Sequence, residues 1–274
     1  MNELLSKLEF WMQPTDNLFL QFADKELGFN LGRKLLNDRR IFVDNGGDVL
    51  FVAHIDTVLP PRIKKRTKKR IHATGLDDRL GCLLAYNLGM ELHADILLTD
   101  DEEKCRSTAL HHVCKDYNWV VEFDRAGDDV VTYEKDSYAF QQVLREYWDI
   151  GFGSYSDIAD LPTTACCFNL GIGYQHAHSK DSYVDLKVLA TQVYKFREFY
   201  EKYNATKFVA EEKIEKLCTS AYSYTYDDAC DVCGGTEQIE EAHGHMICYS
   251  CFNQMVDNFF FEGEDVEKFR MEGV

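Results

Sequence analysis

The 274-residue sequence lacks long apolar runs, and no stretch approaches the roughly 20 apolar residues that a membrane-spanning helix needs. Its first residues, MNELLSKLEFWMQPTDNLFLQF, contain no basic segment followed by an uninterrupted apolar stretch, which is the pattern of a secretory signal peptide. We therefore expect a soluble, cytoplasmic protein without a membrane partner.

Positive charge is scarce, because 30 Lys and Arg residues stand against 47 Asp and Glu residues, for a formal net charge of -17 at pH 7. Such a balance repels nucleic acids and anionic lipids and disfavours a nucleic-acid partner. The carboxylates either form an acidic surface or are gathered to bind metal ions. A hydrophobic content of 45% is enough to build the core of one large domain and a smaller one.

The ten cysteines do not form the pattern of a disulfide framework. Six are scattered, some among apolar residues such as Cys82, Cys166 and Cys167, and four form two CxxC pairs. This distribution is typical of reduced thiols and a bound metal. The segment CDVCGGTEQIEEAHGHMICYSC has the CxxC-x14-CxxC spacing of a zinc ribbon. We predict one structural zinc ion held by Cys230, Cys233, Cys248 and Cys251.

Short apolar runs alternate with helical patterns along the first two thirds of the chain. The runs predict buried strands at VLFVAHI (49–55), ADILLT (94–99), WVVEF (119–123), DVVTY (129–133) and TTACCFNLGIG (163–173). Apolar residues recur at three- and four-residue spacing over 78–93, 137–149 and 188–203, which predicts helices. This alternation predicts an α/β sandwich with a largely parallel or mixed sheet.

Acidic residues and histidines follow several of these strands where the strands end. In open α/β sheets the carboxyl ends of strands are the place where ligands gather. The clusters are His54 with Asp56, Asp77 with Asp78, Asp100 to Glu103, Asp124, and the QHAHSKD segment at 175–181. Any one of them alone is typical of a helix N-cap or a solvent-exposed loop. Together they would repel one another unless cations lay among them, and imidazole with carboxylate is the usual ligand mixture of catalytic zinc.

The order of these motifs over residues 40–190 resembles that of the co-catalytic di-zinc exopeptidases, a family of aminopeptidases, glutamate-releasing zinc carboxypeptidases and related deacylases. HIDTV is similar to the family's His-x-Asp motif, GLDDRLG to its bridging-aspartate motif and TDDEE to its Glu-Glu pair. FDRAG is similar to its next acidic ligand motif, and HAHS to its closing histidine. The resemblance implies a three-layer sandwich with a mixed, mostly parallel central sheet.

Position by position, the resemblance implies that Asp77 bridges two metal ions. His54 and Asp124 would complete one site, and Glu103 and His178 the other. The ions would be zinc, with cobalt or manganese as alternatives.

The resemblance also implies roles for residues that do not bind metal. Glu102 would be the general base, and Asp56 would accept the second ring N–H of His54 and fix its tautomer. The peptide bond between Asp77 and Asp78 would be cis.

Two features depart from the family pattern. EEKCRSTA lacks the glycines that usually follow the Glu pair, so that loop must differ. The acid usually found four residues beyond the last histidine is displaced to Asp181, which keeps His176 as a second choice to His178.

Spacing narrows the predicted activity. Asp124 and His178 are 54 positions apart, which leaves no room for the lid domain that carboxypeptidase-like relatives carry there. A lidless core favours an aminopeptidase that acts on peptides. An amidohydrolase or deacylase acting on a small non-peptide amide is the alternative, and an inactive binding module that uses the zinc ribbon is the second. Asp157 is a candidate for holding the substrate's amino group, but its setting favours a turn residue.

Composition changes after about residue 208, where a charged and then Tyr-, Ser- and Thr-rich stretch begins. We predict a catalytic domain over 1–208, a linker over 209–226, the zinc ribbon over 227–256 and an acidic tail over 257–274.

A basic run, PRIKKRTKKR at 61–70, stands out in the acidic chain with seven basic residues. It is either a solvated hairpin tip or a contact for an acidic substrate or another subunit, and a homo-oligomer therefore stays open. RNA binding lacks support because no aromatic residues are interleaved with the charges.

Overall fold

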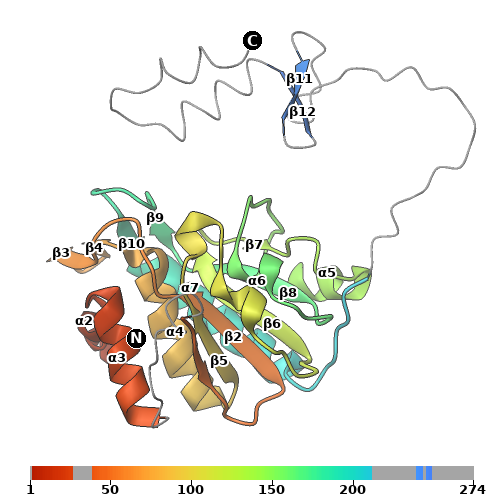
Figure 1. Cartoon of the computed structure of the whole chain (residues 1–274), viewed down its shortest axis with the longest axis horizontal. Helices are drawn as coiled ribbons and strands as arrows, with labels where there is room; N and C mark the ends of the chain where they lie inside the picture. Colours follow the sequence, from red (N-terminus) through yellow and green to blue (C-terminus); the bar gives the residue numbers. More distant parts are fainter. Residues whose placement is uncertain (1, 27–38, 212–238, 243–244, 249–274) are drawn as a thin grey trace, which may run out of the picture. The chain divides into compact units, whose positions relative to one another are not determined.

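The computed structural model describes residues 2–26, 39–211, 239–242 and 245–248 (Figure 1). The chain divides into two compact units, Met1–Lys213 and Ile214–Val274, and each is described by itself. None of the helices in the described part of the chain is long and apolar enough to cross a membrane.

The first unit is built on a six-stranded mixed sheet in the order β1-β5-β2-β6-β8-β7. Its strands are β1 (Ile41–Val43), β5 (Asp95–Thr99), β2 (Val49–His54), β6 (Trp119–Arg125), β8 (Cys167–Gly171) and β7 (Val130–Val131). The four central strands are parallel, and β1 and β7 are antiparallel edges. The predicted α/β fold with a mixed, mostly parallel sheet is therefore confirmed.

Helices cover both faces of this sheet because its strands are apolar on both sides. In β2, Phe51 packs on the face covered by α4 (Leu76–Leu92) and α7 (Leu186–Tyr203), and its ring centroid lies 5.3 Å from that of Phe196 in α7. The side chains of Leu50 and Val52 point to the other face, as alternation along a strand requires. The short helices η3 (Thr108–His111) and α6 (Asp157–Asp160) cover that face. Helix α5 (Tyr138–Leu144) contributes Phe140 to the first face.

A second, four-stranded antiparallel sheet has the order β3-β4-β10-β9. Its strands are β3 (Arg62–Arg66), β4 (Arg70–Thr74), β10 (Tyr183–Asp185) and β9 (Tyr174–Gln175). The basic run therefore forms a complete hairpin. The pattern of apolar residues did not predict these strands, because β3 is largely exposed and charged.

Three N-terminal helices, α1 (Asn2–Ser6), α2 (Leu8–Trp11) and α3 (Thr15–Glu26), precede the sheets. Arg79 of α4 is completely buried, and its guanidinium donates to the Trp11 carbonyl and to the Thr15 hydroxyl, both at 2.9 Å. This buried cation ties the N-terminal helices to the helix that begins at the predicted site.

The described part of the second unit is an antiparallel hairpin of β11 (Ile239–Ala242) and β12 (His245–Cys248). Cys248 ends β12, whereas Cys230, Cys233 and Cys251 lie outside the described residues. The zinc ribbon, the linker and the acidic tail therefore stay predictions.

His112 should make the folded protein sensitive to acid. It is buried, its ring centroid lies 4.7 Å from that of Phe42, and burial together with the charge of Arg40 lowers its pKa to about 4. Because the unfolded chain binds the proton at its ordinary pKa of about 6.5, stability is lost as pH falls through the range 6.5 to 4. We expect His112→Gln to remove about 2 to 3 kcal/mol of this loss.

The measurement is the free energy of unfolding in urea at pH 7 and about pH 4.5, a pH within that window. The matched control is His111→Gln at the exposed neighbouring position. Equal pH dependence of wild type and His112→Gln would contradict the assignment.

Candidate functional site

The predicted site residues come from five elements that meet at the carboxyl edge of the main sheet. His54 is the last residue of β2, and Asp124 lies near the end of β6. Asp77 is in the first turn of α4, the Glu pair begins η2 (Glu102–Lys104), and His178 lies between β9 and β10. The topology thus brings together residues that span more than a hundred positions of the chain.

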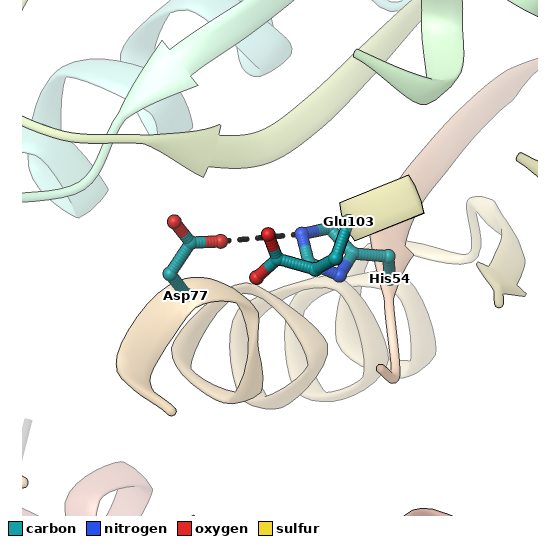
Figure 2. A group of neighbouring side chains, drawn as sticks. All are labelled: His54, Asp77 and Glu103. Atoms are coloured by element: carbon teal, nitrogen blue, oxygen red, sulfur yellow. Dashed lines mark ion pairs between the residues drawn. The ribbon is translucent and has the colours of Figure 1, made fainter. Parts of the chain in front are cut away.

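The carboxylate of Asp77 lies between two imidazoles. Its Oδ1 is 3.2 Å from Nε2 of His54, and its Oδ2 is 3.2 Å from Nε2 of His178. Figure 2 shows Asp77 and His54 facing each other with Glu103 beside them. Each oxygen of one carboxylate is therefore directed at a different histidine, which is the arrangement that a bridging ligand needs.

Further carboxylates divide between the two histidines. Nε2 of His54 is 3.5 Å from Oδ1 of Asp124 and 3.6 Å from Oε2 of Glu102. Nε2 of His178 is 2.8 Å from Oε2 of Glu103. The candidate donor atoms of two groups, His54 with Asp77 and Glu103, and His54 with Glu102 and Asp124, lie within 4.8 Å of one another.

Two atoms of this cluster support a cation as the missing partner. Nε2 of His54 and Oε1 of Glu103 are buried and have no hydrogen-bond partner within the part of the chain that the structure describes. Buried polar atoms normally have one. Imidazole nitrogens and carboxylate oxygens are the metal ligands that suit zinc and related divalent ions. The residues present therefore fit a metal centre.

Asp56 orients both His54 and the Glu pair. Nδ1 of His54 is 3.1 Å from the Asp56 carbonyl oxygen and 3.3 Å from its carboxylate, so Nδ1 is placed to donate to Asp56 and would leave the Nε2 lone pair for a cation. The same carboxylate accepts the backbone N–H of Glu102 at 3.3 Å and of Glu103 at 3.1 Å. One side chain therefore sets the positions of three neighbours.

The charges of the cluster shift the pKa of its members in opposite directions. Burial raises the pKa of Asp124 well above its usual value, and the nearby charge of Asp77 adds to the rise. Burial also opposes ionisation of Asp77, but the neighbouring imidazoles of His178 and His54 outweigh it and lower the Asp77 pKa. Burial raises the pKa of Glu102 to about 7, an effect that Asp157 and Asp77 strengthen and His54 opposes.

Asp78 lies beneath the cluster and supports its backbone. The peptide bond between Asp77 and Asp78 is cis, as the resemblance implied. The buried Asp78 carboxylate accepts the backbone N–H of His54 at 3.3 Å and of Gly81 at 2.9 Å. It therefore links the end of β2 to the start of α4.

Sequence reasoning missed two buried residues near Asp124, Glu122 and Asn169. Asn169 accepts the backbone N–H of Asp124 at 2.9 Å and donates to its carbonyl at 3.2 Å. Glu122 is fully buried and accepts a hydrogen bond from Ser156. The signal available for Glu122 was a single acid inside the apolar run WVVEF.

Asp157, considered above as a substrate anchor or a turn residue, is the first residue of the one-turn helix α6 and is buried. Its carboxylate is completely buried, with Oδ2 accepting from the Thr99 hydroxyl at 2.6 Å and Oδ1 accepting from the Ser107 hydroxyl. Thr99 and Ser107 stand at the two ends of the loop that carries Glu102 and Glu103. The Asp157 carboxylate therefore links the two ends of this loop through hydrogen bonds.

The structure also separates the two histidines of HAHS. His178 faces Asp77 and Glu103, whereas the ring of His176 lies 5.8 Å from the ring of Tyr183. A cavity beside the cluster is lined by Val58, Leu59, Leu76 and Ser182 in addition to Asp77 and His178.

No family model and no curated protein matches the chain. Its fold is similar to that of several solved peptidases. An aminopeptidase from the archaeon Desulfurococcus kamchatkensis has a TM-score of 0.49 and 11% identity, over 73% of this chain and 94% of that one. Aminopeptidase PepT from Bacillus cereus has a TM-score of 0.45 and 12% identity, over 74% and 98%. A tripeptidase from Staphylococcus aureus has a TM-score of 0.45 and 10% identity, over 61% and 84%. These similarities are too weak to assign an activity.

Removing the Asp157 carboxylate should loosen the loop of the Glu pair. Asp157→Ala leaves the buried hydroxyls of Thr99 and Ser107 without their acceptor, and we expect a loss of roughly 2 to 4 kcal/mol in the free energy of unfolding. Hydrogen exchange of the amides in residues 100–108 should rise more than in β2.

Asp136→Ala is the matched control, because Asp136 is also buried and accepts a hydrogen bond from the Thr132 hydroxyl, not from the loop of the Glu pair. A variant Asp157→Ala that exchanges and unfolds like wild type would show that Asp157 does not hold the loop.

Proposed function

We propose that this protein is a metal-dependent hydrolase that cleaves an amide or peptide bond, and specifically an aminopeptidase with two metal ions. The observation that carries the proposal is the single carboxylate of Asp77, whose two oxygens face the imidazoles of His54 and His178. The sequence resemblance to co-catalytic di-zinc exopeptidases supports the same reading of these residues.

The cluster supplies ligands for two ions. His54 and Asp124 would hold one ion, Glu103 and His178 the other, and Asp77 would serve both. Bound metals of this kind lower the pKa of water and polarise a carbonyl oxygen, which is the chemistry that amide hydrolysis needs. The orphaned buried atoms of His54 and Glu103 support this use of the donor set.

Glu102 is the proposed general base. A base for this reaction has to take a proton from the attacking water and deliver it to the leaving amine, so its best pKa lies near the working pH. Burial places the pKa of Glu102 at about 7 in the protein alone. Its backbone N–H is fixed by Asp56, and the ends of its loop are held by Asp157, so the carboxylate stays oriented while it exchanges the proton.

The space around the cluster favours a peptide end as the substrate. The described residues between Asp124 and His178 form β7, α5, α6, β8 and β9, and no separate lid domain occurs among them. Beside the cluster, the exposed Val58 and the half-buried Leu59 can contact an apolar part of the substrate. An amidohydrolase acting on a small non-peptide amide is the second candidate, because the same cluster performs that chemistry.

Metal content should depend on Asp77. We expect about three zinc ions per wild-type chain, two at the cluster and one at the predicted ribbon, and about one in Asp77→Ala. Elemental analysis of the purified proteins measures this. Asp181→Ala is the control, because Asp181 is exposed and adjoins the same loop. One ion in both proteins would limit binding to the ribbon and favour the binding-module alternative.

Turnover should depend on Glu102. We expect Glu102→Gln to keep its metal and its fold while losing roughly 100- to 10,000-fold in kcat, because it removes a general base. Release of amine from aminoacyl amides measures the rate, and N-acyl amino acids tested in parallel separate the aminopeptidase from the amidohydrolase. Asp101→Asn is the matched control, since this neighbouring carboxylate pairs with Lys104. Near-normal turnover of Glu102→Gln would refute its role.

A further inference from the structure

The β3–β4 hairpin concentrates positive charge on an acidic protein. It contains seven of the 30 Lys and Arg residues of a chain whose net charge is -17. All seven side chains belong to exposed residues. A cluster of one sign in a chain of the opposite sign creates a local field that attracts anionic ligands.

Only part of this charge is neutralised by neighbours. Arg66 pairs with Glu9 at 3.2 Å, and Arg70 lies 4.1 Å above the ring of Tyr183 and 3.9 Å from Asp185. The remaining cations have no carboxylate within 4.0 Å in the described ranges, and they are Arg62, Lys64, Lys65, Lys68 and Lys69. These five are available to an external anion.

The hairpin begins at the rim of the candidate site. Arg62 stands opposite Thr74 in the sheet register, and Thr74 is three residues before Asp77. Nζ of Lys64 donates to the carbonyl of Lys180 at 2.5 Å, and Lys180 is two residues after His178. In Figure 1 the hairpin lies beside β10, the strand with which β4 pairs.

Lys180 extends the same basic surface, because its carbonyl oxygen accepts a hydrogen bond from Lys64 of the hairpin. It is exposed, and it has no carboxylate partner in the portion of the chain that is described. Lys180 lies in the loop that holds His178, and Arg62 lies on the strand that pairs with β4, the strand leading to Asp77. We call these two residues the rim cations.

We propose that the basic hairpin and Lys180 bind the acidic part of a peptide substrate, downstream of the bond that is cleaved. This inference rests on the proposed peptidase function and names its substrate class. Extended peptides and β-strands both advance about 3.3 Å per residue, so β3, with five residues, matches a stretch of about five substrate residues. A peptide whose first residue lies at the cluster would place acidic residues from about the third position onward along the cations.

Two other uses of the charges give different expectations. Lysines on an edge strand such as β3 prevent unwanted strand pairing, but that use does not distinguish among substrates. A nucleic acid would also be attracted, yet the run has no interleaved aromatic residues to stack on bases, and the protein as a whole repels polyanions.

The test compares two peptides with the same first residue and length, one with Gly and one with Glu from the third position onward. Wild type and Arg62→Gln/Lys180→Gln are assayed for kcat and KM with the metal-loaded protein. Lys64 is left intact because its hydrogen bond supports the loop of His178. The matched control is Arg145→Gln/Lys207→Gln, which removes the same amount of charge elsewhere. Arg145 caps the end of α5, and Lys207 pairs with Asp116.

We expect the acidic peptide to be preferred by wild type through a lower KM. The rim variant should raise KM for the acidic peptide roughly three- to tenfold, because it removes one or two exposed charge pairs between protein and peptide. Its kcat should be unchanged. The neutral peptide and the control variant should show no change. Raising the ionic strength to about 0.5 M should raise KM for the acidic peptide only, because salt screens the charge interactions that bind it.

Binding provides a readout that does not need turnover. Fluorescence anisotropy of both labelled peptides on Glu102→Gln, with and without the rim substitutions, should show the same three- to tenfold selectivity in Kd. Charge-selective binding, together with no hydrolysis of either peptide by the metal-loaded wild-type protein, would overturn the peptidase function and still support the acidic ligand. Equal KM and Kd for the two peptides, or tighter binding of a single-stranded RNA than of the acidic peptide, would overturn the inference.

Discussion

The site depends on one constraint, which is that the carboxylate of Asp77 must lie between His54 and His178. These residues belong to the start of α4, the end of β2 and the loop before β10, so the contact forms only when the two sheets are packed in their native arrangement. Asp78 stabilises this arrangement, because its carboxylate accepts hydrogen bonds from backbone N–H groups of both β2 and α4. The cluster is therefore a product of the tertiary fold and not of any local motif.

The buried acids around this contact are supported by donors that the fold places beneath them. Thr99 and Ser107 donate to Asp157, Asn169 holds the backbone of Asp124, and Asp56 receives the N–H groups of the Glu pair. A buried carboxylate without such partners would be strongly destabilising. The atoms that stay without partners in the described chain belong in part to His54 and Glu103, at the surface where a cation would lie. Asp56 and Asp157 are thus held by protein donors, whereas Nε2 of His54 and Oε1 of Glu103 are left to face the proposed metal ions.

The main sheet could be predicted from sequence because its strands are buried on both faces and appear as continuous apolar runs such as VLFVAH. The convergence of His54, the Glu pair and Asp124 could be predicted because β2, β5 and β6 are parallel and their carboxyl ends share one edge. The second sheet could not, since β3 carries charges and β9 has only two residues. The role of Asp157 was also hidden, because its partners Thr99 and Ser107 are about fifty positions away and only the fold brings them beneath the loop.

An acidic cluster and a basic hairpin lie close together on this molecule, and the two can have different roles toward a substrate. The cluster itself is acidic, so without metals it would repel an anionic peptide as the rest of the chain does. Two divalent cations would offset the charge of the ligating carboxylates and leave the site close to neutral. The hairpin starts at Arg62, which pairs with Thr74 three residues before Asp77, and its charges then set the local sign of the field. Substrate charge would be selected at the hairpin, while bond cleavage is left to groups that need no charge on the substrate.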